Sequence, residues 1–149
     1  MEPHFHATEE QQGVRDRVFA LLMTQAFRID ATIFEKSKAH PHLRNDPDRF
    51  YRTAWHAHMR HLAPRIADAM DELLVVAASI GTKRQRIGIH QSINNVIGAV
   101  APAAAYRTAF WSASSDPCLQ IADYCCWAIQ RKWERNDPRS YRLIRATSW

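Results

Sequence analysis

The chain is poor in the residues that build redox, covalent or membrane sites. It holds only 3 cysteines and 4 glycines among 149 residues. Cys118, Cys125 and Cys126 lack Cys-x-x-Cys spacing, and their odd number and apolar surroundings predict reduced core thiols in a cytoplasmic protein. The absence of a Gly-rich phosphate loop and of Gly-x-Ser-x-Gly leaves P-loop and serine-hydrolase chemistry without support. Because no apolar run approaches the roughly 20 residues of a membrane span, we expect no membrane partner.

The size and composition predict one folded domain that covers residues 1–149. Hydrophobic residues make up 46% of the chain, which is typical of a globular protein with a core. The formal net charge is +5 and the isoelectric point is about 9.4. A charge of this size is compatible with a nucleic-acid partner, and it is equally compatible with an ordinary basic protein.

Strand-like and helix-like patterns alternate along the chain. Strand patterns occur at 3–7, 28–35, 72–78 and 105–110, and helical patterns at about 8–25, 47–63, 89–100, 117–134 and from 138 onward. This alternation predicts an α/β fold with a mixed or mostly parallel sheet of about four strands flanked by helices. The continuous apolar run at 72–78 predicts a central strand that is covered on both faces.

One helix, which begins near Asp116, carries the most informative acid of the chain. Asp116 is a good N-cap residue and Pro117 suits the first helical position. Residues at steps of three and four predict a buried stripe along this helix: Cys118, Ile121, Ala122, Cys125 and Ile129. Asp123 lies beside that stripe, where a carboxylate is costly unless it is paired. Its partner could be an arginine, a backbone N–H or a divalent metal ion.

The same helix carries a family resemblance. The run 119–124, Leu-Gln-Ile-Ala-Asp-Tyr, is followed by Trp-Ala-Ile at 127–129 and by a basic segment that reaches Glu134. Together with Asp137 and Tyr-Arg-Leu-Ile at 141–144, this pattern resembles the C-terminal signature of the domain-of-unknown-function 3800 family. The resemblance implies a ribonuclease H-like fold.

Members of that family usually begin with a strand that carries Asp-Glu-Ser, and the helix acid that matches Asp123 is thought to complete an acidic site with it. This chain has no Asp-Glu-Ser, and its start resembles a point inside the family domain. We therefore expect a domain that lacks its N-terminal hairpin. Loss of a hairpin would leave a sheet edge open, so we also expect a homo-oligomer formed through that edge.

The resemblance also implies a metal-dependent site. In ribonuclease H-like enzymes, carboxylates hold two Mg²⁺ or Mn²⁺ ions about 4 Å apart for phosphodiester cleavage. Asp123 has the right chemistry for a catalytic and metal-binding role, whereas a cap role fully explains Asp116, the second candidate. The segment 77–79, where family members often carry an Asp, reads Ala-Ala-Ser. One acid does not make a two-metal site, so whether the chain is an enzyme stays open.

Basic residues provide the second functional signal. Lys83, Arg84 and Arg86 follow the strand at 72–78, at the edge where open α/β sheets bind ligands. Arg131 and Arg135 belong to a basic C-terminal quarter with interleaved aromatic residues. These five residues are candidates for phosphate contacts, and the alternative is a solvated helix face. The other face of the helix expected at 47–63 holds Arg49, Arg52, His56 and Arg60.

Two hypotheses follow from these observations. The first is a ribonuclease H-like, nuclease-related domain whose acidic site is incomplete in this chain. The second is a non-catalytic module that binds nucleic acid or serves in assembly.

Overall fold

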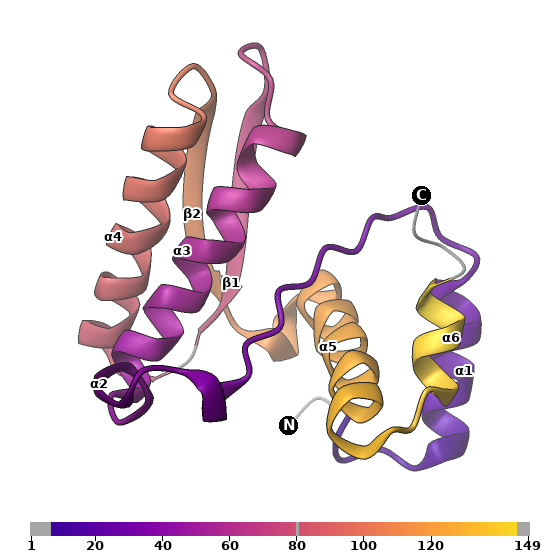
Figure 1. The fold of residues 1–149 in the computed structure, drawn as a ribbon. Helices are drawn as coiled ribbons and strands as arrows, with labels where there is room; N and C mark the ends of the chain where they lie inside the picture. The colour runs from indigo at the N-terminus through magenta and orange to yellow at the C-terminus, as the bar shows by residue number, and fades with distance from the viewer. Residues whose placement is uncertain (1–6, 80, 146–149) are drawn as a thin grey trace. The chain divides into compact units, whose positions relative to one another are not determined.

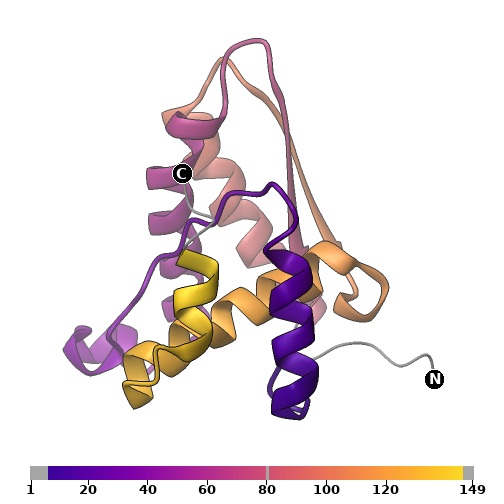
Figure 2. The same ribbon diagram turned by 90° about the vertical axis from the view of Figure 1, so that its right-hand side faces the viewer.

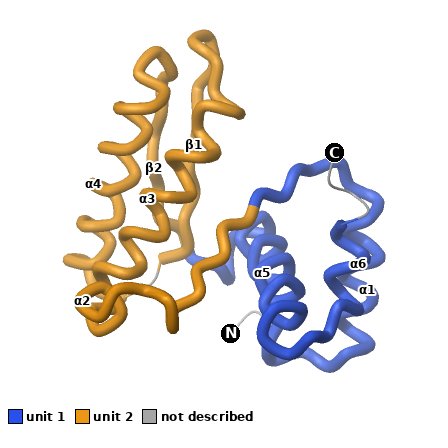
Figure 3. The backbone as a smooth tube through the Cα atoms, viewed as in Figure 1, with its two compact units in different colours: residues 1–30, 112–149 blue, residues 31–111 orange. Residues whose placement is uncertain are grey.

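The protein forms two compact units in the computed structural model, which describes residues 7–79 and 81–145. Unit 2 comprises residues 31–111, and unit 1 comprises residues 1–30 together with 112–149 (Figure 3). The described part contains six α-helices and one two-stranded parallel sheet, which confirms the α/β class. None of its helices is both long enough and apolar enough to span a bilayer.

Unit 2 is a strand–helix–strand motif with additional helices before it. Its elements are α2 (Pro41–Arg44), α3 (Pro47–Ile66), β1 (Glu72–Ala78), α4 (Lys83–Val100) and β2 (Ala105–Trp111). The two strands pair in parallel, with Val75 opposite Thr108, so that α4 is the crossover between them. Both α3 and α4 lie on the same side of the sheet (Figures 1 and 2).

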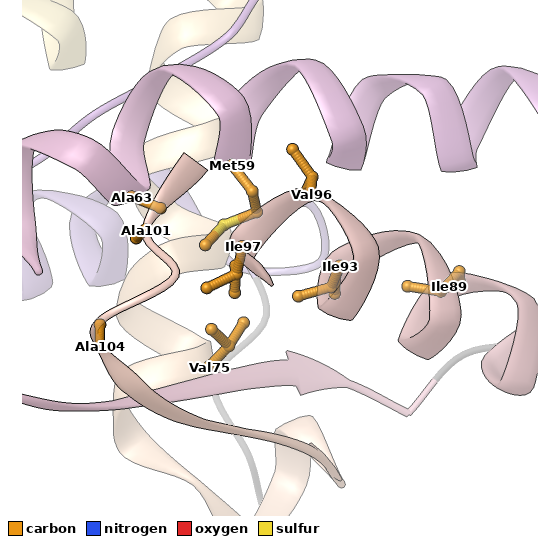
Figure 4. Packing of buried hydrophobic residues seen from close by; sticks show 9 residues of the cluster. All are labelled: Met59, Ala63, Val75, Ile89, Ile93, Val96, Ile97, Ala101 and Ala104. Atoms are coloured by element: carbon orange, nitrogen blue, oxygen red, sulfur yellow. The ribbon is translucent and has the colours of Figure 1, made fainter. Parts of the chain in front are cut away.

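The core of unit 2 lies between this helix pair and the inner face of the sheet. Ile93 and Ile97 of α4 are fully buried there against Val75 of β1 (Figure 4). The whole cluster comprises Met59, Ala63, Val75, Ile89, Ile93, Val96, Ile97, Ala101 and Ala104. Spacings of three and four along α4 place Ile89, Ile93, Val96 and Ile97 on one stripe, as the sequence predicted.

The outer face of the sheet is open to solvent. Leu74 of β1 is 52% exposed and Trp111 of β2 is 43% exposed. The prediction that the strand at 72–78 is covered on both faces is therefore wrong, although its position as a strand is confirmed. The apolar run identifies the strand, but within the described residues only one of its two faces is packed against helices.

Capping residues set the starts of the two long helices of unit 2. The Asp46 side chain accepts a hydrogen bond from the Arg49 backbone N–H at 2.9 Å, and Pro47 occupies the first turn of α3. Thr82 and Gln85 form a capping box at the start of α4. Gly81, with φ of +66°, supplies the left-handed turn before this box. Helix α4 therefore begins earlier than the sequence predicted.

Unit 1 consists of three helices, α1 (Gln12–Leu22), α5 (Pro117–Arg135) and α6 (Arg139–Arg145). The ring of Phe19 in α1 meets Tyr124 of α5 edge to face, with ring centroids 5.7 Å apart. The buried cluster of this unit comprises Ala7, Phe19, Leu22, Tyr124, Cys125, Ala128 and Ile144. Helix α5 ends at Asn136, a left-handed C-cap residue.

Two N-terminal predictions are wrong and a third lies partly outside the described residues. No strand forms at 28–35, because the alternating pattern there has no neighbouring strand to complete its hydrogen bonds. Helix α1 begins later and ends earlier than the helical pattern at about 8–25 predicted, with Gln11 as its N-cap and no side-chain cap bond. Of the strand expected at 3–7, residues 3–6 lie outside the described part and Ala7 lies in a turn.

Candidate nucleic-acid interface

The Asp123 carboxylate is engaged in the structure of unit 1. Its Oδ2 accepts a hydrogen bond from the backbone N–H of Ala7 at 3.0 Å. Ala7 is fully buried and Asp123 is half-buried in the second turn of α5. Of the partners considered for this acid, a backbone N–H is therefore observed, and it offsets part of the cost of burying the carboxylate.

Asp116 does not join Asp123 in a metal site. The Asp116 Oδ1 accepts a hydrogen bond from the Leu119 backbone N–H at 2.8 Å, which is the predicted N-cap role. The two acids stand seven residues apart on one helix, a rise of about 10 Å, whereas a Mg²⁺ ligand lies at about 2.1 Å from its ion. Among residues 7–79 and 81–145, no three His, Cys, Asp or Glu side chains converge on a point that could hold a metal. Within the described residues, Asp116 and Asp123 therefore do not form a two-metal centre.

The cysteines of α5 correct the prediction of a buried stripe. Cys125 is buried, and burial raises the pKa of its thiol to about 11, so it is an inert core thiol. Cys118 and Cys126 are exposed, as is Ala122, so the stripe predicted through 118, 122 and 125 is wrong at two of its positions. The buried face of α5 instead runs through Tyr124, Cys125 and Ala128.

Arg131 has a structural role at the end of α5. Its guanidinium forms an ion pair with Asp137 at 3.0 Å and lies over the Trp127 ring, 5.5 Å from the centroid. Asp137 has a lowered pKa, first because the Arg139 backbone N–H donates to it and then because of Arg131. Arg135 is exposed in the last turn of the same helix. Of the two cationic residues predicted in this unit, only Arg135 projects from the surface.

The basic cluster of unit 2 lies in the first turn of α4. Lys83 and Arg84 are exposed there, whereas the Arg86 guanidinium donates a 2.7 Å hydrogen bond to the Gly81 carbonyl. The side-chain amide of Gln85, which lies between Arg84 and Arg86 in the sequence, donates a 2.7 Å hydrogen bond to Asp48 of α3. The structure thus leaves two of the three predicted residues exposed at the N-terminal end of a helix, where the helix dipole favours anions.

The excess positive charge of the chain belongs to unit 2. Residues 31–111 contain 11 Lys and Arg against 6 Asp and Glu, a net of +5. Unit 1 contains 9 of each sign and is neutral, so unit 2 accounts for the whole formal charge of the chain. Lys83, Arg84 and Arg86 belong to the charged unit, whereas Arg131 and Arg135, the other two predicted residues, belong to the neutral unit.

A polar cleft lies between α3 and α4, and the sequence predicted no function for Arg49, Arg52 and His56, which line one side of it. It has a volume of about 440 Å³ and is lined by Arg49, Arg52, Thr53, His56, Gly88, Gln91, Ser92 and Asn95. The helical spacing of Arg49, Arg52 and His56 is visible in the sequence. The other wall of the cleft could not be predicted, because nothing in the sequence of α4 shows that Gly88, Gln91, Ser92 and Asn95 face α3.

Comparison with family models, with curated proteins and with solved structures finds no significant match to this chain. The fold and the side chains of the chain itself are therefore the basis for a functional assignment.

Proposed function

We propose that this chain is a ribonuclease H-like, nuclease-related domain with an incomplete acidic site, and that it binds nucleic acid through unit 2 without cleaving it. The observation that carries the proposal is the distribution of charge, because unit 2 holds the entire net charge of +5. Nonspecific binding to nucleic acid draws most of its free energy from Lys and Arg contacts to phosphates. The predicted residues Lys83 and Arg84 are exposed on this unit and are available for such contacts.

The engagement of both candidate acids supports the non-catalytic part of the proposal. Asp123 holds the Ala7 backbone and Asp116 caps α5. Metal-assisted phosphodiester cleavage needs several carboxylates around the metal ions. Asp123 and Asp116 instead each hold a different part of the backbone. Binding of Mg²⁺ or Mn²⁺ at Asp123 remains a prediction to be measured, and no reaction step is assigned to it.

The proposal predicts salt-dependent binding without cleavage. Fluorescence anisotropy with labelled 20-nucleotide RNA and DNA should show binding at about 50 mM salt that weakens linearly in a plot of log K against log salt concentration. In parallel, the same oligonucleotides with Mg²⁺ or Mn²⁺ should remain uncut by the wild type and by Asp123→Asn. Absence of binding at low salt would refute the proposal. Cleavage that the Asp123→Asn substitution abolishes would restore the nuclease hypothesis instead.

A second candidate function is assembly through the open sheet. Each of the two strands has an unpaired edge within the described residues, and the outer face exposes Leu74 and Trp111. Unpaired strand edges are templates for pairing with another chain. We therefore propose homo-oligomer formation through this sheet as the alternative role.

This alternative predicts a concentration-dependent increase in mass during sedimentation. A Leu74→Lys variant should shift the chain toward the monomer, because it places a charge on the outer face of β1. An Ile87→Lys variant is the control, since Ile87 is 49% exposed on α4 and away from the sheet face. A wild-type chain that stays monomeric at about 100 μM, within the concentration range at which exposed strand edges associate, would exclude the assembly role.

A further inference from the structure

The cleft between α3 and α4 has one cationic wall and one neutral polar wall. Arg49, Arg52 and His56 line it from α3, and Gln91 and Asn95 line it from α4. Its remaining lining residues are Thr53, Gly88 and Ser92. No carboxylate is among these described residues, so the cleft offers hydrogen-bond donors and positive charge and little that would repel an anion.

The two walls follow from helical spacing and from the direction of the helices. On α3, steps of three and four from Arg49 to His56 place the cationic side chains on one face, and residues 88, 91, 92 and 95 form the matching face of α4. Residue numbers rise together along the two helices, since Asp48 contacts Gln85 and the Arg52 carbonyl accepts a 3.2 Å hydrogen bond from the Ser92 hydroxyl. The helices therefore run in the same direction, as Figure 1 also shows.

Gly88 makes room for Arg52 across the cleft. A Cβ atom at position 88 would lie 3.2 Å from the Arg52 Cδ and 3.5 Å from its Nη1. The missing side chain lets the Arg52 stem lie against α4 while the residue remains exposed. A side chain whose stem already lies against a neighbouring helix has less conformational entropy to lose when a ligand binds.

The electrostatic environment of the cleft favours an anion. It lies beside the N-terminal half of α3 and the middle of α4, so its positive character comes from the Arg49 and Arg52 side chains. The nearby acids are occupied: Asp46 caps α3, and Asp48 accepts from the Gln85 side chain. Within the part of the chain that the structure describes, neither Arg49 nor Arg52 forms an ion pair with a carboxylate. Their guanidinium groups are available to an external partner.

We infer that this cleft, here called the α3–α4 groove, binds the phosphate backbone of the nucleic acid. The inference rests on the proposed function and assigns it a site. Arg49 and Arg52 would contact phosphate oxygens in the bidentate manner that guanidinium groups favour. The amide and hydroxyl groups of Gln91, Ser92 and Asn95 would add neutral hydrogen bonds.

The chemistry of the groove favours contacts to the backbone over contacts to bases. None of its eight lining residues is Phe, Tyr or Trp, whereas proteins that hold unstacked single strands present several such rings to the bases. The stretch from Arg49 to His56 rises about 10 Å along α3, over which one strand of a duplex presents about three phosphates. We therefore expect binding that is insensitive to base sequence.

The test compares two double variants that change the net charge equally. Arg49→Gln with Arg52→Gln removes two charges from the groove, and Arg135→Gln with Arg142→Gln removes two exposed charges from unit 1. With a labelled 20-base-pair duplex, the groove variant should bind about tenfold more weakly at about 0.1 M salt, and the slope of log K against log salt should fall by about two. The unit 1 variant should stay within about twofold of the wild type, since the proposal places the phosphate contacts on unit 2 and exposed charges that make no contact are largely screened at this salt concentration.

A Gln91→Glu variant provides a second measurement with little risk to folding. Gln and Glu have similar helix propensity and Gln91 is exposed, so only the charge inside the groove changes. This variant should also weaken binding several-fold. A wild-type chain that does not bind the duplex would refute the proposed function itself. A wild-type chain that binds, with the groove variants no weaker than the unit 1 variant, would refute the groove and leave the proposed function in place.

Discussion

Replacement of Phe19 by alanine is expected to lower the free energy of unfolding of unit 1 by about 3–5 kcal/mol. Phe19 is fully buried in α1, and its ring lies edge to face with Tyr124 and 6.4 Å from the Trp127 ring. Truncation would leave a cavity between α1 and α5 and remove the aromatic contact, which adds to the loss of buried apolar area.

Amide hydrogen exchange measures this effect separately for each unit. Exchange in 12–22 and 117–135 should accelerate in Phe19→Ala, because the opening of packed helices controls exchange at their amides. Leu21→Ala is the matched control, since Leu21 lies on the same helix and is 63% exposed. That variant should cost less than about 1 kcal/mol. Equal effects of the two substitutions would contradict the packing of α1 against α5.

Replacement of Ile97 by alanine should have the corresponding effect on unit 2, a loss of about 2–5 kcal/mol. Ile97 is fully buried in the cluster that joins α3, α4 and β1 (Figure 4). The same cluster holds α3 against α4 and therefore keeps the two walls of the α3–α4 groove together. We expect nucleic-acid binding to fall in this variant at temperatures where unit 2 begins to open.

Ile87→Ala is the control for this second substitution, because Ile87 belongs to the same helix and is 49% exposed. Exchange in 47–66 and 83–100 should accelerate in Ile97→Ala and remain near the wild-type rate in Ile87→Ala. If Ile97→Ala left exchange in these two helices unchanged, the assigned core of unit 2 would be wrong.

Local signals in the sequence predicted the parts of the fold that local chemistry determines. Asp116 and Pro117 mark the start of α5, and the polar cap Asp46 with Pro47 marks the start of α3. The apolar run at 72–78 and the alternation after residue 104 correctly predicted the two strands. Each of these features depends on neighbours within a few residues, so that the pattern alone suffices.

Features that depend on distant neighbours could not be predicted in the same way. The segment 28–35 alternates like a strand, but a strand forms only where another backbone completes its hydrogen bonds. The exposure of Cys118 and Ala122 depends on which face of α5 packs, and a small-residue stripe does not show this. Similarly, the spacing of Arg49 and Arg52 indicates only an exposed helix face. That this face forms one wall of a groove depends on the packing of α4.

Asp123 illustrates both outcomes. The sequence correctly identified it as an acid that needs a partner, because it lies beside a buried helix face. It could not identify the partner, since the Ala7 N–H lies 116 residues away along the chain. The resemblance to a nuclease-related family favoured a metal ion as the partner. In the structure, this carboxylate accepts a backbone hydrogen bond.

Arginine footprinting in the presence of bound nucleic acid tests the central claim most directly. The chain would be treated with phenylglyoxal, with and without a saturating 20-base-pair duplex, and the modified peptides identified by mass spectrometry. We predict that Arg49 and Arg52 become protected while Arg135 and Arg142 are modified equally in both samples. Protection of Arg135 and Arg142, with Arg49 and Arg52 unchanged, would place the interface on unit 1 and contradict the account.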